Sequence, residues 1–223
     1  MNPPSTNLLI EQLALFGQRW HRRRASYRPA GEPFDPTRCT VVPIEEGDAK
    51  HFVLMHHYSG TYPAARFRAG VFVKEPFQRE RLAGVGVFSV PMNQRVIPSY
   101  FPALAPNEGV ELGRFVLDDS LAANAETWAL ARMRRLLRQA LPEVRGIVAY
   151  CDPIERRDEC GELVKRGHVG TIYKAGNAQY RGRSSARMLF SRAWTRSSWA
   201  SISRSMSRQS ASGWATNSSS RFT

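Results

Sequence analysis

The chain has 223 residues, of which 42% are hydrophobic, enough for one domain with a buried core and flexible ends. No apolar run approaches the roughly 20 residues that cross a bilayer, and no basic region leads into an apolar stretch at the start, so neither a transmembrane helix nor a secretory signal is expected. Three cysteines without a CxxC motif argue against a disulfide scaffold and favour the reducing cytoplasm. The net charge of +13 attracts polyanions, which makes DNA, RNA and acidic membranes candidate partners.

Residues 1–38 are predicted to form a basic helical arm and a linker. Apolar residues recur at helical spacing from Leu8 to Phe16, and Ser5 or Thr6 can cap the helix, which is expected over residues 5–26. Its end carries a basic cluster of Arg19, His21, Arg22, Arg23 and Arg24, and a Pro- and Gly-rich link follows from Arg28 to Pro36. The arm can lie along a phosphate backbone or serve as a solvated packing arm.

Residues 39–183 show the pattern of an α/β domain. Strands are predicted at 39–44, 67–74, 82–90, 110–117 and 146–151, helices at 49–58 and 124–140, a Pro-rich loop from Pro91 to Pro106, and less regular elements near Val169–Lys174 and Tyr180. The order β-α-β-β-β-α-β predicts a central mixed β-sheet flanked by helices. This order resembles the GNAT-like fold of acetyltransferases.

Residues 184–223 differ in composition, being rich in Ser and Arg and lacking acidic residues. This composition predicts an irregular, disordered tail. A change of reading frame near Met188–Ser191 is one hypothesis for it, which sequencing of the nucleotides past that point tests, and such a change would leave this copy inactive or partly folded. Because part of the net charge lies in this tail, the charge counts for less as evidence of DNA binding.

The first motif is His-His-Tyr-Ser-Gly at residues 56–60. His57 shares a helix face with Val53 and precedes the glycine turn, where a histidine can act as a base or a metal ligand. The Tyr58 phenolate can add a hard ligand if a cation lowers its pKa. The structural alternative is a histidine placed at a helix C-terminus because the macrodipole favours it there.

The second motif is Tyr-Cys-Asp-Pro at residues 150–153, and the third is Gly-His-Val-Gly-Thr-Ile-Tyr-Lys-Ala at residues 167–175. Asp152 follows an apolar strand, and the carboxyl end of a strand is where α/β folds bind ligands; the alternative is a turn-initiating Asp before Pro. Tyr173 is expected at the end of a short strand, where it can donate a proton or orient a substrate. The alternative is an ordinary loop and strand.

The fourth motif is Glu-Leu-Gly-Arg-Phe-Val-Leu-Asp-Asp at residues 111–119, followed by a helix start at Asn124. Arg114 interrupts an apolar strand, so its charge needs a partner or an opening. Asn124 and Thr127 lie where an acetyltransferase-like fold would hold the pyrophosphate of coenzyme A on a helix N-terminus. The usual Gln/Arg-x-x-Gly-x-Gly/Ala fingerprint is absent, and plain helix capping is the alternative.

Two further features have weaker signals. The helix at 124–140 carries Arg132, Arg134, Arg135 and Arg138, which form either a phosphate-contacting stripe or an ordinary exposed face. A zinc site of Cys151, Cys160 and His168 is a competing idea, but their spacing matches no usual zinc pattern.

Together and in this order, the four motifs resemble the phage Mom family of DNA-modification proteins. The resemblance implies a GNAT-like fold and conversion of adenine in double-stranded DNA to an N6-carbamoylmethyl-type base, which protects phage DNA from restriction in the host cytoplasm. It implies an acyl-CoA donor, such as acetyl-CoA. A departure from the family pattern is the long, charged segment Ile154–Arg166 between the second and third motifs.

The resemblance also implies roles for individual residues. His57, Tyr58 and Asp152 fall on a metal-associated active site of the Fe(II) type, and Tyr173 on a motif tyrosine of the catalytic group. Arg114 and Thr127, with the helix cap Asn124, fall on positions that handle acyl-CoA or substrate. Two other functions stay open: an ordinary acyl-CoA-dependent N-acetyltransferase acting on a small amine or protein, and a non-catalytic basic nucleic-acid-binding module.

Overall fold

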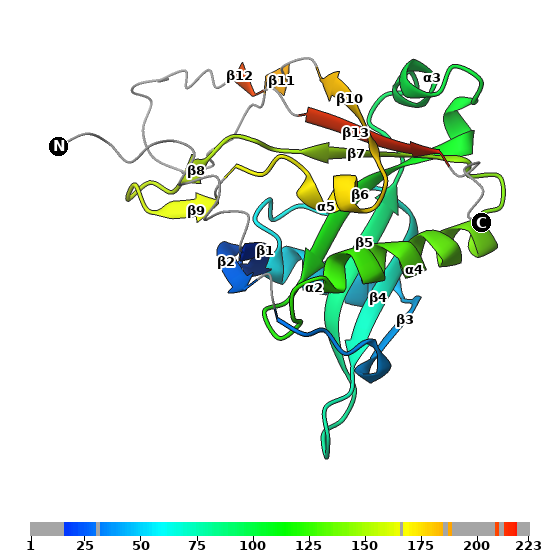
Figure 1. Ribbon diagram of the computed structural model, residues 1–223. Coiled ribbons are helices and arrows are strands. Elements are labelled where there is room, and N and C mark those ends of the chain that lie inside the picture. The colour runs from blue at the N-terminus through cyan, green and yellow to red at the C-terminus, as the bar shows by residue number, and fades with distance from the viewer. Residues whose placement is uncertain are drawn as a thin grey trace.

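A computed structural model describes residues 16–29, 32–165, 167–184, 187–188, 208–209 and 212–217 (Figure 1). Its centre is a seven-stranded sheet in the order β10-β13-β7-β6-β5-β4-β3. The strands of this sheet are β3 (Cys39–Pro43), β4 (Ala65–Val73), β5 (Arg81–Ser89), β6 (Gly109–Leu117), β7 (Gly146–Cys151), β10 (Gln179–Arg183) and β13 (Ser212–Asn217). The α-helices are α2 (Glu46–His56), α3 (Val96–Tyr100), α4 (Ala125–Ala140) and α5 (Thr171–Ala175).

Smaller elements surround this sheet. They are the 3-10 turns η1 (Pro36–Arg38) and η2 (Pro106–Glu108) and the paired strands β1 (Phe16–His21) with β2 (Arg24–Pro29), β8 (Arg156–Arg157) with β9 (Leu163–Lys165), and β11 (Arg187–Met188) with β12 (Arg208–Gln209). Among the described helices, none has the length and apolar character that a bilayer crossing requires.

The pairing between β6 and β7 is short, and this positions the candidate site. Strands β3 to β6 pair antiparallel, whereas β6 and β7 are parallel and pair from Gly109–Gly146 to Leu112–Ala149. A β-bulge at Gly113 then changes the register of β6 against β5. Within the described residues, β6 and β7 do not pair beyond Leu112. The space between the C-terminal ends of the two strands can therefore hold side chains.

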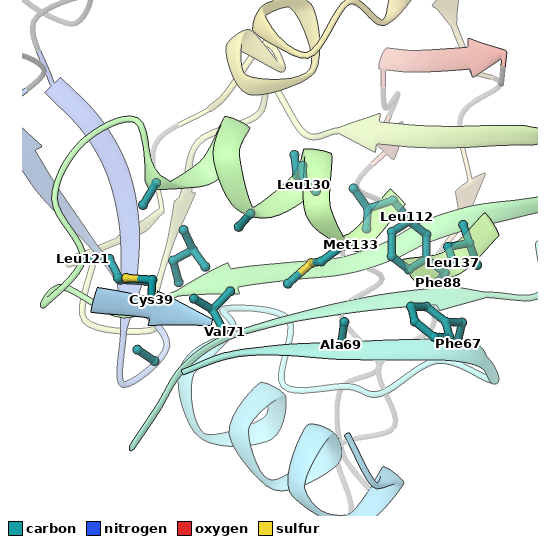
Figure 2. Packing of buried hydrophobic residues seen from close by; sticks show 14 of the residues in the cluster. Cys39, Phe67, Ala69, Val71, Phe88, Leu112, Leu121, Leu130, Met133 and Leu137 are labelled. Carbon is teal, nitrogen blue, oxygen red and sulfur yellow. The ribbon is translucent and has the colours of Figure 1, made fainter. Parts of the chain in front are cut away.

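The two faces of the sheet carry different helices. On one face, α4 buries Leu130, Met133 and Leu137 against strand residues that include Phe88 and Leu112, as Figure 2 shows. Each such side chain stabilises the fold by about 1.5–3 kcal/mol through removal of apolar surface from water. The other face holds α2, which packs Ala49, Phe52 and Val53 on Val85, Val87 and Val116, while Ile97 of α3 packs on Val148.

The structure confirms the predicted mixed sheet flanked by helices, with most element boundaries within a few residues. Helix α2 starts at Glu46, three residues before the predicted start at residue 49, and Glu45 occupies its N-cap position. The loop predicted from Pro91 to Pro106 contains the short helix α3. Tyr173 lies in helix α5 instead of a strand, because Gly170 with a φ of +76° turns the backbone into a helix start.

The predicted N-terminal helix is wrong for its described part. Residues from Phe16 to Pro29 form the antiparallel hairpin β1–β2, joined by Arg22 and Arg23. Both arginines have positive φ, 45° and 68°, as a two-residue hairpin turn requires. Residues 5–15 of the predicted helix lie outside the described residues.

The C-terminal region predicted to be irregular contains a strand. β13 pairs antiparallel with β7 along its whole length and with β10 on its other side. The edge of β7 is thus covered by a strand from residues 212–217, while most of the predicted tail lies outside the described residues.

Candidate active site

Residues of all four sequence motifs meet where β6 and β7 separate. His57 and Tyr58 come from the end of α2, Arg114 from β6, Asp152 from the end of β7, and Tyr173 from α5. Tyr58 interacts electrostatically with Asp152 and Arg114, and Tyr173 interacts with Tyr58. Tyr58 packs with the α2 face of the sheet and Tyr173 with the α4 face, so the two phenols approach the gap from opposite sides.

His57 is a buried, neutral histidine. Its side chain is 7% exposed, and its Nδ1 accepts a hydrogen bond from the Ser59 backbone N–H at 3.2 Å and lies 2.9 Å from the Ser59 hydroxyl. Burial lowers the pKa of His57 to about 3, and the positive charge of Arg114 and the interaction with the His168 imidazole act in the same direction. Because Nδ1 is an acceptor, Nε2 carries the proton and can donate it as a hydrogen bond.

Two phenols of the site stay protonated. Burial raises the pKa of Tyr58 to about 12, and the Asp152 carboxylate acts in the same direction. The Tyr58 ring stacks on His57 with 4.5 Å between the ring centroids. Burial also raises the pKa of Tyr173, with contributions from Cys151, Tyr58 and Glu111. Each phenol therefore offers a proton rather than a negative charge at neutral pH.

Asp152 is an anion held by two cations. Its Oδ2 accepts hydrogen bonds from Arg156 Nε at 3.1 Å and Nη2 at 2.8 Å, and lies 3.4 Å from Lys165 Nζ. Its Oδ1 accepts from the Ile154 N–H at 3.1 Å. Burial alone would raise the pKa of Asp152, but the charges of Lys165 and Arg156 outweigh it and the pKa is lowered.

The third motif closes the site from the other side. His168 Nε2 accepts a hydrogen bond from the Asp152 N–H at 3.4 Å, and the His168 N–H donates to the Asp152 carbonyl at 2.9 Å. Burial lowers the pKa of His168 to about 4, with help from Lys165. A Cβ at Gly167 would lie 1.9 Å from the Pro153 carbonyl oxygen, so only glycine allows this close approach.

Arg114 ties β6 to the loop after α2. Its Nε donates to the Thr61 carbonyl at 3.0 Å, Nη2 donates to the Thr61 hydroxyl at 2.5 Å, and Nη1 donates to the Gly113 carbonyl at 2.5 Å. The Arg114 guanidinium is thus held by the carbonyls of Thr61 and Gly113 and by the Thr61 hydroxyl. Arg114 belongs with His57 and Tyr58, and not with the start of α4.

Asn124 and Thr127 lie at the N-terminus of α4. Asn124 occupies the N-cap position with a φ of +70°, and its exposed side chain makes no cap hydrogen bond with the described first turn. The Thr127 hydroxyl donates back to the Asn124 carbonyl at 3.1 Å. The expected capping by the Asn124 side chain is therefore absent here, and the Ala125 N–H donates instead to the Ala122 carbonyl at 3.4 Å. Glu126, buried in the same turn, adds a negative charge that a phosphate must tolerate.

An apolar pocket opens beside Tyr173 on the α4 face. It is a shallow hollow between α4, α5 and the strands β5, β6 and β7, and it amounts to about 390 Å³ only when open solvent is included. Its lining residues are Phe88, Leu112, Leu130, Arg134, Ile147, Ala149, Ile172, Tyr173, Gly176 and Ala178. Arg134 bridges its rim by donating to the Gly176 carbonyl at 2.9 Å. Because Tyr173 belongs to both, the pocket and the polar centre are adjacent.

The predicted iron ligands come together but do not fit a metal ion. The Asp152 carboxylate already accepts from Arg156 and lies beside Lys165, whose charges repel a second cation. Formation of a phenolate ligand is costly because burial raises the pKa of Tyr58. Within the described ranges, no three His, Cys, Asp or Glu side chains are placed to hold a metal. Cys160 of the competing zinc idea is exposed, whereas Cys151 is buried.

Sequence reasoning missed Arg156 and Lys165. Both lie in the charged segment after the Tyr-Cys-Asp-Pro motif, which folds into the β8–β9 hairpin. Arg156 stands four residues after Asp152, a spacing that can signal an ion pair, but Lys165 reaches Asp152 only because the hairpin reverses the chain. The arginines Arg132, Arg135 and Arg138 of α4 are exposed, and Arg132 lies over the Trp128 ring at 4.1 Å.

Comparison with known protein families assigns this chain to one of them. The fold is a mixed β-sheet flanked by helices, and its polar centre lies where two parallel strands separate. The model of the Mom protein family matches residues 38–222, a range that contains all the motif residues of the centre. The chain belongs to the Mom protein family. A sequence search among curated proteins gave no match.

Solved structures with a similar arrangement are acetyltransferases. The ribosomal-protein-S5-alanine acetyltransferase from Vibrio fischeri has 12% identity and a TM-score of 0.49, with 84% of this chain and 96% of that chain covered. The spermidine/spermine N-acetyltransferase from Vibrio cholerae, in complex with manganese ions, has 11% identity and a TM-score of 0.41, with 82% and 95% covered. A dodecameric spermidine N-acetyltransferase from Vibrio cholerae has 10% identity and a TM-score of 0.43, with 82% and 95% covered.

Proposed function

We propose that this chain modifies adenine in double-stranded DNA at the exocyclic N6, using a donor of the acyl-CoA class. The product is an N6-carbamoylmethyl-type adenine that shields DNA from restriction. The observation that carries the proposal is the convergence of four separate Mom-family motifs on one buried polar centre. A half-buried Asp, two neutral histidines and two half-buried phenols with raised pKa in one place are typical of catalytic sites rather than of surfaces that only bind nucleic acid.

The basic hairpin supports DNA as the partner. Arg22 and Arg23 are exposed at the turn between β1 and β2. The Arg23 N–H donates to the His56 carbonyl at 2.9 Å, and the Arg23 guanidinium lies against Gly60, so this turn is fixed beside the first motif (Figure 1). Arginines that contact phosphates position a duplex without reading its sequence. The adenine must leave the base stack, because its N6 amine is engaged in pairing.

The groups of the centre suit acyl transfer from a thioester to an amine, a step that joins the nitrogen to a carbonyl carbon and forms an amide. In that step the new C–N bond forms as the C–S bond breaks, the nitrogen loses a proton, and the thiolate gains one. The protonated Tyr173 phenol, between the apolar pocket and the polar centre, is suited to supply the thiolate proton. The Nε2–H of His57 is suited to hold a carbonyl oxygen, because a neutral imidazole can donate without needing a counter-charge.

The same architecture offers a place for the donor. The N-terminus of α4 at Asn124 and Thr127 is the place where a pyrophosphate would meet a helix dipole, and the apolar pocket lies beside the same helix. When bound, coenzyme A supplies an activated acyl carbon. A carbamoylmethyl group is joined to N6 through a methylene carbon and ends in an amide. Acyl transfer alone therefore does not form it, and a further substrate must supply both the N6–CH2 bond and the amide nitrogen.

Restriction digests of plasmid DNA from cells that produce the protein test the proposal. We expect resistance to enzymes whose sites contain adenine, and normal cutting by enzymes whose sites contain only G and C. Complete cutting by both enzyme groups, together with newly acetylated polyamines or proteins in the same cells, would instead identify an ordinary N-acetyltransferase. Complete cutting with DNA binding and no acetylation would identify a non-catalytic binding module.

A further inference from the structure

The ammonium group of Lys165 has the surroundings of a bound cation. Lys165 is 0% exposed although it carries a charge. Its Nζ donates to the Asp152 carbonyl at 2.8 Å and to the Ile154 carbonyl at 2.5 Å, and lies 3.4 Å from Asp152 Oδ2. Two carbonyl oxygens and a carboxylate oxygen are the ligand types that hard metal cations prefer.

The β8–β9 hairpin positions the Lys165 ammonium group at Asp152. Strands β8 and β9 pair antiparallel, which brings Lys165 opposite Arg156. Arg156 holds the outer side of the same carboxylate, and the two cations lie 5.7 Å and 5.5 Å from the centroid of the Tyr58 ring. A buried charge is tolerated only when it is paired and hydrogen-bonded, and Lys165 meets both conditions.

We propose that Lys165 is a tethered cation that occupies the position a metal ion would take at Asp152. It is a positioning residue: it neutralises the carboxylate and holds the Asp152–Ile154 turn, so that His168 and Tyr58 keep their places. The inference takes the cluster as the active centre of the proposed function, but its test reads metal content and thermal stability. The proposal for Lys165 can therefore be refuted while adenine modification is confirmed, and adenine modification can be refuted while the proposal for Lys165 is confirmed.

The direct test is cation rescue of Lys165→Ala, with Lys174→Ala as the control because Lys174 is an exposed lysine on α5. Loss of a buried charge partner should lower the Tm of Lys165→Ala by roughly 5–15 °C. Ethylammonium chloride or manganese chloride should recover part of this loss, while sodium chloride at equal ionic strength should not. Wild type and Lys174→Ala should show no such cation dependence. An unchanged Tm in Lys165→Ala, or a loss that neither cation recovers, would contradict the proposal.

Metal binding by the wild-type chain gives a second test that needs no destabilised variant. Anaerobic titration with Fe(II) and with Mn(II), followed by metal analysis after gel filtration, should leave less than a tenth of an equivalent of metal on the protein. One retained equivalent that disappears in Asp152→Ala would overturn the proposal. If Lys165→Ala does not fold, this titration decides alone.

Discussion

The two histidines of the centre make the stability of the protein depend on pH. His57 and His168 both have a pKa far below that of an exposed histidine, about 3 and about 4, chiefly because burial disfavours their charged forms. The unfolded chain takes up these protons near pH 6.5, whereas the folded chain takes them up only at much lower pH. The unfolded state therefore binds more protons between these values, and stability falls as the pH falls through 6.5.

We expect the free energy of unfolding to drop by roughly 2 kcal/mol for each of these histidines between pH 7 and pH 5. Urea unfolding followed by circular dichroism at both pH values measures it. His57→Gln and His168→Gln should each reduce the difference, while His51→Gln should not, because His51 is exposed on the same helix that ends at His57. Equal unfolding free energies at pH 7 and pH 5 in the wild type would contradict the buried neutral state.

At the level of single residues, sequence reasoning found the motif residues but not their charge state. His57, Tyr58, Asp152 and Tyr173 could be named because short motifs mark them. Asp152 has ion pairs with Arg156 and Lys165, and the one with Lys165, thirteen residues further on, forms only through a hairpin. A pairing of this kind has no local signal, so the sequence favoured a metal ligand set where the structure has an ion pair.

Elements whose apolar residues recur with a clear period could be predicted from the sequence, and elements that depend on a turn could not. The apolar strands from β4 to β7 and the helix α4 follow from their residue patterns alone. The β1–β2 hairpin was mistaken for a helix because its turn is Arg22-Arg23, without the Asn or Gly that usually marks positive φ. β13 was missed because this short strand lies in a Ser-rich region and gains its stability from pairing with β7 rather than from its own sequence.

The hairpin turn should contribute to DNA affinity. Replacement of Arg22 and Arg23 by Glu should weaken duplex binding in fluorescence anisotropy and reduce the slope of log affinity against log salt by about one for each phosphate that the protein no longer neutralises. Arg79→Glu is the control, because it makes the same type of charge change on the exposed turn between β4 and β5. Equal weakening in both proteins, or none in the hairpin variant, would rule out a specific role of the turn.

The close approach of the third motif to the second should make Gly167 irreplaceable. Gly167→Ala places a methyl group within 1.9 Å of the Pro153 carbonyl oxygen, so we expect destabilisation of at least about 1–3 kcal/mol. Gly47→Ala in α2 is the matched comparison, since nothing lies within 4 Å of its Cβ, and it should be neutral or slightly stabilising. Urea unfolding compares them, and a Gly167→Ala protein as stable as Gly47→Ala would show that the two motifs do not touch.

For the whole molecule, the sheet brings distant segments together to form one site. The separation of β6 and β7 lets α5 and the end of α2, on opposite faces, each place a tyrosine in the gap, and the basic hairpin lies beside it. A single buried centre, an adjacent apolar pocket and a basic surface are the parts that modification of a flipped base requires. On this arrangement rests the proposal that the centre alters adenine in DNA.

Mass spectrometry of nucleosides measures that modification itself. DNA from cells producing the wild-type chain should contain a heavier deoxyadenosine, and the added mass tells a carbamoylmethyl group from an acetyl group. His57→Ala and Asp152→Ala proteins should give unmodified DNA while keeping the wild-type circular dichroism spectrum, and Lys74→Ala, at an exposed position outside the motifs, should modify normally. Unmodified deoxyadenosine in DNA from cells that contain folded wild-type protein would contradict the proposed function.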